Sequence, residues 1–253
     1  MVSFPLRDPH ARPNLFLPMS TIAIIVPCFN EANRMQPQAF VAFGKANPGS
    51  VFFFVNDGSR DQTGELLEKI NEQLPNSRVI HLAQNKGKGE AVRQGLLTAI
   101  DEDFSFAGYL DADLSTSLEE FQRLCKIAIE KNADVVFGSR IKKLDSHIER
   151  SAARHLIGRG IATLIDNRFG LGIYDTQCGA KIFSSSILPA VLKEPFLTRW
   201  FFDVELFLRI RNEHKTAAYE VPLQKWTNVK NSKISLASFP SVAKELWTLS
   251  RKY

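Results

Sequence analysis

The sequence predicts an α/β fold in which a mostly parallel, Rossmann-like sheet is flanked by helices in a single domain. Short apolar runs, each long enough for one buried strand, alternate with segments whose apolar residues recur at helical spacing. Such alternation is typical of parallel strands joined by right-handed crossovers. No linker rich in proline, glycine or serine divides the 253 residues, and a chain of this length can bury a full core.

The first half of the chain alternates strand and helix. Its first two apolar runs suit strands that are buried on both faces, and Asn47-Pro48-Gly49 is a typical helix stop. In order, we predict strand Thr21–Cys28, helix Gln38–Ala46, strand Val51–Val55, helix Thr63–Leu74, strand Arg78–Leu82, helix Gly89–Asp101, strand Phe106–Leu110, helix Leu118–Lys131 and strand Asp134–Phe137.

After Gly138 the pattern changes to longer helices and irregular segments. We predict helix Ser151–Arg168, mixed loop and strand over Gly170–Phe183, helix Phe201–Arg211, strand Ala217–Leu223 and helix Pro240–Arg251. The first of these helices should bury Leu156, Ile157, Ile161, Leu164 and Ile165. We expect an arm over residues 1–20, the main domain over 21–235, and an amphipathic basic helix over 236–253.

Composition narrows the class of protein. Cys28, Cys125 and Cys178 are too far apart for a zinc spacing and too few for a disulfide framework, which favours a reducing cytoplasmic setting. The net charge of +5 suits anionic ligands, and no nucleic-acid-binding motif accompanies it. No apolar run approaches the ~18 residues that a membrane-spanning helix needs. Met1–Ser20 holds four prolines and interspersed charges, unlike a secretory signal.

Asp111 and Asp113 directly follow the apolar run that ends at Leu110. In an extended strand, residues two apart point the same way, so both carboxylates could face one point at the strand's carboxyl end, where open α/β sheets bind ligands. Their oxygens suit Mg²⁺ or Mn²⁺ held together with substrate phosphates. By itself the pair is a weak signal, and a turn before a helix capped by Ser115 or Ser117 is then the better interpretation.

Two further polar clusters follow the first and second strands. They are Pro27-Cys28-Phe29-Asn30-Glu31 and the run from Asn56 to Thr63. Each alone is a favourable turn, but three clusters at neighbouring strand ends indicate one shared crevice. In a nucleotide site Asp57 could accept from a base N–H, and Glu31 from base or ribose.

The loop Asn85–Gly89 precedes a helix, and its lysines, Lys86 and Lys88, could attract anions or simply be solvated in a turn. It is a poor dinucleotide fingerprint, because Val92 stands where a third glycine belongs and the loop follows the third strand. A Walker A loop is absent from the sequence.

Together these motifs resemble those of family-2 glycosyltransferases of the GT-A fold. The residues concerned are Val26–Glu31, Val55–Ser59, Asn85–Gly89 with Arg93, and Tyr109–Ser115. Within that family, Asp175–Lys181, Arg199–Glu205, Trp226 and Ser232-Lys233-Ile234 resemble the dolichyl-phosphate β-glucosyltransferase branch, with Ala180 where that branch usually has Phe. The resemblance runs from about Thr21 to about Ile234.

The resemblance implies roles for individual residues. Asp113 would bind the divalent metal, Mg²⁺ or Mn²⁺, that bridges the donor diphosphate, and Asp111 would contact the ribose or assist the metal. Arg140 could clamp a phosphate, or instead be a surface arginine at a strand end. The remaining residues implied in nucleotide-sugar binding are Pro27, Phe29, Glu31, Asp57, Lys88, Ala112 and Lys233.

Asp203 stands where related inverting enzymes carry a general base. A polyprenyl phosphate is already an anion near pH 7, so we expect Asp203 to orient the sugar or the nearby arginines and lysines. An Asp favoured by the dipole in the first turn of its helix is an equally good interpretation.

Basic residues gather where a lipid phosphate could approach. They are Arg140, Lys142, Lys143, Arg150, Arg154, Arg159 and Arg168, and six more follow from Lys225 onward against one acid. The terminal helix could lie on an anionic membrane surface, or dock on the domain with a solvated basic face.

These observations indicate an inverting, metal-dependent hexosyltransferase that moves glucose from UDP-glucose to a dolichyl- or undecaprenyl-type polyprenyl phosphate. Three alternatives stay open: a GDP-mannose donor, a sugar or protein hydroxyl as acceptor, and a non-catalytic nucleotide-sugar-binding subunit. The intact Asp57, Asp111 and Asp113 argue against the last. We expect a cytoplasmic protein, with peripheral attachment to the cytoplasmic membrane face, and no nucleic-acid partner.

Overall fold

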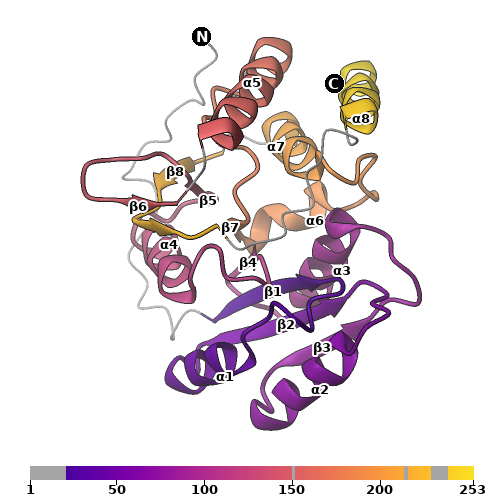
Figure 1. Ribbon diagram of the computed structural model, residues 1–253, viewed down its shortest axis with the longest axis vertical. Helices are drawn as coiled ribbons and strands as arrows, with labels where there is room; N and C mark the ends of the chain where they lie inside the picture. Colours follow the sequence, from indigo (N-terminus) through magenta and orange to yellow (C-terminus); the bar gives the residue numbers. More distant parts are fainter. Residues whose placement is uncertain (1–20, 150–151, 214–215, 229–238) are drawn as a thin grey trace.

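A seven-stranded sheet forms the centre of the molecule (Figure 1). The computed structural model describes residues 21–149, 152–213, 216–228 and 239–253. The strand order is β3-β2-β1-β4-β7-β5-β8, and every neighbouring pair is parallel except that β7 is antiparallel to both β4 and β5. The strands are β1 (Ile22–Cys28), β2 (Ser50–Asn56), β3 (Arg78–His81), β4 (Phe106–Leu110), β5 (Val135–Ser139), β7 (Ala180–Ser184) and β8 (Ala218–Pro222). The predicted mostly parallel sheet is confirmed.

Helices cover both faces of this sheet. Alternate residues of β2 point to opposite faces. Phe52 and Phe54 belong to the apolar cluster that contains residues of α1, α2 and α4, whereas Phe53 and Val55 belong to the one that contains residues of α3 and α7. The helices are α1 (Pro37–Ala46), α2 (Thr63–Gln73), α3 (Lys88–Asp101), α4 (Leu118–Glu130), α5 (Ala152–Phe169), α6 (Leu188–Val191), α7 (Phe202–Glu213) and α8 (Phe239–Lys252).

The predicted elements lie within a few residues of the observed ones, and local chemistry explains the boundaries. The Ser117 hydroxyl accepts a hydrogen bond from Glu120 N and caps α4, as one interpretation of the Asp-pair region expected. The sequence did not indicate α6, the short 3₁₀ turn Ser185–Ile187, or the small two-stranded sheet of β6 (His147–Ile148) and β9 (Lys225–Trp226). These elements are too short to carry a periodic pattern.

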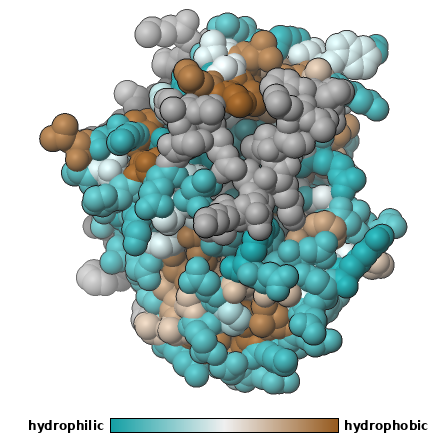
Figure 2. All heavy atoms as spheres, viewed as in Figure 1, coloured by the Kyte–Doolittle hydropathy of each residue, from teal (hydrophilic) through white to brown (hydrophobic). Residues whose placement is uncertain are grey.

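The predicted burial of α5 is wrong for three of its five apolar residues. Ile165 is buried, but Leu156, Ile157 and Leu164 are 71%, 43% and 55% exposed. The helix packs along a narrow side that includes Ile165 and Phe169, and no other described element covers its outer side. Figure 2 shows apolar side chains gathered on the surface over this part of the molecule.

No helix in the described ranges is long and apolar enough to cross a lipid bilayer. The predicted arm over residues 1–20 lies outside the described residues. So do residues 229–238, which include the end of the predicted main domain and the start of the predicted terminal helix. The division of the chain at residues 20 and 235 therefore stays a prediction.

Candidate active site

The carboxyl ends of β2, β1 and β4 lie side by side, because these strands are adjacent and parallel. The first two polar clusters meet there, as predicted. Asn30 N donates to Ser59 Oγ over 3.0 Å, and Arg60 N donates to Asn30 Oδ1 over 2.9 Å. Glu31 N reaches Thr63 Oγ1 at 2.8 Å. Two turns distant in sequence thus form one hydrogen-bonded wall at the edge of the sheet.

Asp57 anchors the lysine-glycine loop to this wall. Its carboxylate is almost fully buried and accepts from Lys86 N at 2.7 Å, Gly87 N at 2.9 Å and Asn85 Nδ2 at 2.9 Å. Gly58 makes this close approach possible: its φ is +63°, and a Cβ there would lie 2.6 Å from Asn85 N. The Asp57 carboxylate therefore shapes the loop, and its predicted contact with a base stays a prediction.

Three residues predicted to hold base and ribose occur at the end of β1. Pro27 and Phe29 are half-buried, and Glu31 is buried with an ion pair to Arg34 at 2.5 Å. Glu31 thus has a cationic neighbour within the protein.

Asp111 and Asp113 lie in a turn, because β4 ends at Leu110. Leu114 N donates to Asp111 O at 3.2 Å, and Leu114 has a φ of +54°. The argument from strand alternation therefore does not apply to this pair. Both carboxylates are half-exposed, while Ala112 between them is buried, and Asp113 Oδ1 accepts from Ser115 N at 3.0 Å.

The donor set of this turn fits a divalent cation that is shared with a substrate. Two half-exposed carboxylates offer hard oxygen ligands, and no cluster of three or more His, Cys, Asp or Glu able to hold a metal exists in the described part of the chain. Mg²⁺ and Mn²⁺ would then take their remaining ligands from phosphate and water. Gly179 preserves the space for the Asp111 carboxylate, since a Cβ there would lie 2.0 Å from Asp111 Oδ2.

Lys88, the first residue of α3, contacts this turn directly. Its Nζ lies 2.6 Å from Asp111 Oδ1 and stands over the rings of Tyr109 and Phe202, 5.5 and 5.7 Å from their centroids. Loss of solvent contact lowers the pKa of Lys88, but the carboxylates of Asp111, Asp203 and Asp113 together outweigh this effect, so the pKa is raised.

Behind the turn, Lys181 of β7 and Asp203 of α7 form a buried ion pair. Lys181 Nζ lies 2.7 Å from Asp203 Oδ1 and donates to Cys178 O at 2.7 Å. The Tyr109 hydroxyl donates to the same carboxylate oxygen, and burial together with Asp203 raises the pKa of Tyr109 well above its usual range. Asp203 therefore faces into the protein, toward Lys181 and Tyr109.

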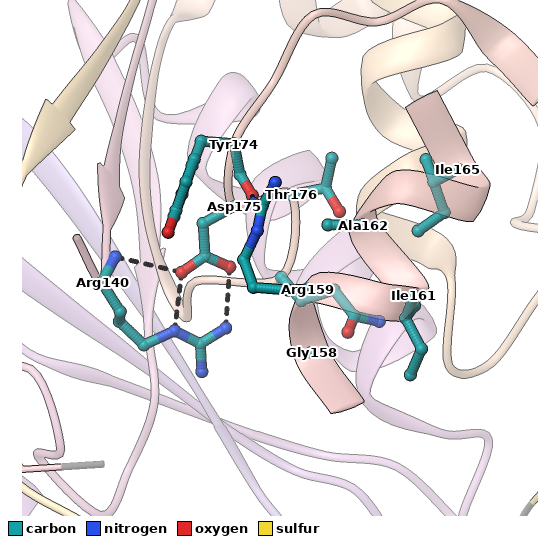
Figure 3. A pocket seen from close by; sticks show the side chains of 10 residues that line it. Arg140, Gly158, Arg159, Ile161, Ala162, Ile165, Tyr174, Asp175 and Thr176 are labelled. Atoms are coloured by element: carbon teal, nitrogen blue, oxygen red, sulfur yellow. Dashed lines mark hydrogen bonds and ion pairs between the residues drawn. The ribbon is translucent and has the colours of Figure 1, made fainter. Parts of the chain in front are cut away.

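Arg140, just past β5, is paired with Asp175 (Figure 3). Its Nε and Nη2 donate to the two carboxylate oxygens at 2.7 Å each, and its backbone N adds a third bond at 3.1 Å. Burial alone would raise the pKa of Asp175, but Arg140 lowers it to about 2. The guanidinium that was predicted to clamp a phosphate is thus directed toward a carboxylate of its own chain.

A small pocket lies between this pair and α5. Figure 3 shows Arg159 reaching from α5 toward Tyr174 and Asp175. The Arg159 guanidinium stacks 3.9 Å from the centroid of the Tyr174 ring and donates to Tyr174 O at 2.8 Å. Two guanidinium groups and one carboxylate therefore line the same hollow.

The family model described as Glycosyl transferase family 2 matches residues 23–192 of the chain. The chain belongs to this family. Dolichyl-phosphate beta-glucosyltransferase of Dictyostelium discoideum is 31% identical over 92% of this chain and 74% of its own length. The protein of the same name from Saccharomyces cerevisiae is 32% identical over 85% of this chain and 70% of its own.

Solved structures show the same fold. Glucosyl-3-phosphoglycerate synthase of Mycobacterium tuberculosis, in complex with Mn²⁺, UDP-glucose and phosphoglyceric acid, has a TM-score of 0.67, with 91% of this chain and 80% of that chain covered. Its sequence identity is 15%, so the likeness concerns the fold alone. The GT-A fold expected for this family 2 glycosyltransferase is confirmed.

The structure of this glycosyltransferase also places polar and charged residues at the site to which the sequence assigned no individual role there. Lys181, Tyr109, Asp175 and Arg159 all contact predicted site residues or line the pocket beside them. A lysine inside the apolar strand Ala180–Ser184 was a usable signal, because a charge enters a buried strand only with a partner. Lys233 lies outside the described residues.

Cys178 of the glycosyltransferase is buried, and burial raises the pKa of its thiol to about 11. At neutral pH it stays protonated and is a poor nucleophile. Cys28 and Cys125 are also buried and free, in line with the expected absence of a disulfide framework.

Proposed function

We propose that this glycosyltransferase moves glucose from UDP-glucose to a polyprenyl phosphate of the dolichyl or undecaprenyl type, with inversion at the sugar carbon. The observation that carries the proposal is the likeness to dolichyl-phosphate beta-glucosyltransferases, which extends over 92% of the chain for the Dictyostelium protein. The matched region therefore includes both the first half of the chain, where the donor would bind, and the second half, with Asp175, Lys181 and Asp203.

The donor would bind at the carboxyl ends of β1, β2 and β4. Pro27, Phe29 and Glu31 would hold base and ribose, beside the loop that Asp57 anchors. Asp113 and Asp111 would hold Mg²⁺ or Mn²⁺, and the buried Ala112 keeps the two carboxylates on a fixed turn. When bound, the metal supplies Lewis acidity that neutralises charge on the departing nucleoside diphosphate.

The pairing of Asp203 suits a phosphate acceptor. A polyprenyl phosphate is an anion near pH 7, so its attacking oxygen needs no base. Asp203 lies 4% exposed between Lys181 and Tyr109, a position for holding neighbouring groups in place. A hydroxyl acceptor would instead require a carboxylate open to the substrate.

The exposed side of α5 and the helix α8 would bring the enzyme to its lipid substrate at the cytoplasmic face of a membrane. Trp247 of α8 is 60% exposed with the Arg251 guanidinium 4.9 Å from its ring centroid, and Arg168 of α5 donates to Ser250 O at 2.6 Å. Helices that enter the interface of an anionic bilayer typically combine exposed apolar side chains, tryptophan and arginine. The helices α5 and α8 together carry all three.

A transfer assay tests the proposal. Purified protein would be incubated with Mn²⁺, labelled UDP-glucose or GDP-mannose, and either a polyprenyl phosphate or a hydroxyl acceptor. We expect label to enter the organic phase only with UDP-glucose and the lipid phosphate. Lipid labelling from GDP-mannose would show that GDP-mannose, and not UDP-glucose, is the donor. Labelling of the hydroxyl acceptor alone would show that the acceptor is not a lipid phosphate.

The metal assignment is tested in the same assay by Asp113→Ala, with the exposed Asp101→Ala at the end of α3 as a matched control. Turnover should fall at least about a hundredfold in the first variant and stay unchanged in the second. No turnover by the wild-type protein with any donor would favour the non-catalytic subunit.

A further inference from the structure

The ion pair between Lys88 and Asp111 lies within the turn assigned to the metal. Lys88 Nζ is 2.6 Å from Asp111 Oδ1, and the two side chains are 37% and 35% exposed. An ammonium group at this distance occupies a carboxylate oxygen that a divalent cation would use. The protein's own side chain thus already places a positive charge at the proposed cation site.

Several close contacts set the path of the Lys88 side chain. The glycines on either side of it allow this approach, because a Cβ at Gly87 would lie 2.8 Å from Arg199 Nε, and one at Gly89 would lie 2.6 Å from Phe202 Cβ. The ammonium group then rests over the Tyr109 and Phe202 rings. On the other side, Gly179 leaves space for the Asp111 carboxylate.

A lysine is an unfavourable choice for the first turn of a helix. The amino end of α3 carries the positive end of the helix dipole, which favours anions and opposes cations. Asp111 compensates the charge of Lys88 within the protein. A nucleotide diphosphate at the same place would supply two further negative charges and could replace Asp111 as the partner of the ammonium group.

We propose that Lys88 is an internal counter-ion of the metal site: it holds Asp111 while the donor is absent, and it moves to the diphosphate when nucleotide and metal bind together. This role rests on the proposed function, which places the metal at Asp111 and Asp113. Lys88 weakens binding of a divalent cation to the empty site and strengthens binding of the metal-nucleotide complex. The site consequently favours a cation that arrives with its nucleotide.

A Mn²⁺ titration of the purified protein tests this role of Lys88. Electron paramagnetic resonance measures the free Mn²⁺, with and without UDP. Lys88→Met should bind Mn²⁺ alone about fivefold more tightly than wild type, the factor expected for loss of one partly exposed ion pair. The factor by which UDP tightens Mn²⁺ binding should shrink by at least as much, because the coupling is reciprocal. Lys88→Arg, which keeps the charge, should behave like wild type.

Two comparisons separate the ion pair from general charge effects. Lys86→Met removes the same charge from an exposed residue two positions earlier, and it should change Mn²⁺ affinity less than Lys88→Met does. In an Asp111→Asn background, Lys88→Met should give no gain in affinity. Lys88→Gln serves in place of Lys88→Met if melting curves show that the latter is unfolded.

Equal Mn²⁺ affinity in wild type and Lys88→Met would overturn the proposal, as would an equal gain in Lys86→Met or in the Asp111→Asn background. If Mn²⁺ binding follows the proposal but no donor is turned over, the counter-ion role stands and the proposed function fails. If UDP-glucose is turned over but Mn²⁺ affinity does not depend on Lys88, the proposed function stands and the counter-ion role fails.

Discussion

Replacing Asp175 by Asn should destabilise the protein in a pH-dependent way. Asp175 accepts three hydrogen bonds from Arg140, and both side chains are largely buried. Asn keeps the size of the side chain and one acceptor oxygen but removes the charge. The variant therefore isolates the contribution of the ion pair from that of packing.

The magnitude follows from the pKa of Asp175. Arg140 lowers it from the usual 3.8 to about 2, and one pKa unit corresponds to about 1.36 kcal/mol, so the pair contributes roughly 2.5 kcal/mol at pH 7. Because the folded-state pKa is the lower one, this stability is fully present above the unfolded-state pKa. It is lost as the pH falls toward the folded-state pKa, about half of it by pH 3.

Urea unfolding at pH 7 and at pH 3 measures both effects. At pH 7 the variant should lose roughly 2 to 3 kcal/mol, or about 5–10 °C in melting temperature for a chain of this size. At pH 3 the difference between variant and wild type should be about half as large. The exposed Asp101→Asn is the control. A variant as stable as wild type at pH 7, or a difference independent of pH, would refute the reasoning.

Three further changes have expected outcomes. Gly179→Ala places a Cβ 2.0 Å from Asp111 Oδ2, and it should weaken Mn²⁺ binding in the presence of UDP and cost about 1–3 kcal/mol in urea unfolding. Tyr109→Phe removes the hydroxyl that donates to Asp203. It should lower the free energy of unfolding by about 1–2 kcal/mol, and it should reduce kcat by a larger factor than it changes KM. Trp247→Ser should reduce sedimentation with anionic vesicles several-fold and leave the melting temperature unchanged.

Each of these changes has a control or an outcome that would contradict it. Gly160→Ala adds the same methyl group on α5, where nothing lies within 4 Å, and should be neutral or stabilising. A Tyr109→Phe protein with wild-type stability and kcat would show that its hydroxyl carries no positioning role. For Trp247, equal sedimentation of variant and wild type, or equal binding to neutral and anionic vesicles, would count against a membrane surface on α8.

The sequence was informative wherever local chemistry decides the structure. Apolar runs such as Thr21–Cys28 indicated buried strands, and the polar residues after them indicated one edge of the sheet. Partners at long range could not be predicted, because they depend on tertiary packing. The bonds of Asp57 to the loop 28–30 residues later and of Arg140 to Asp175 are of this kind.

The error on α5 has a related cause. Helical spacing of Leu156, Ile157 and Leu164 indicates an apolar side but does not say what covers it. In a helix that enters a membrane interface, the same pattern faces outward. The strand alternation argument for Asp111 and Asp113 failed for a local reason, since Leu110 is the last residue of β4 and a turn follows.

The position of β7 has a consequence for biosynthesis. Both partners of β5, which are β7 and β8, come later in the chain than β5 itself. While the ribosome extends the chain, β1 to β4 can assemble as soon as β4 has emerged, but β5 has nothing to pair with before residue 180. Until then β4 and β5 each present an unpaired edge, the kind of surface through which nascent chains associate. A chain that stops before Ala180 should therefore aggregate, whereas one that includes β7 and β8 can close its sheet.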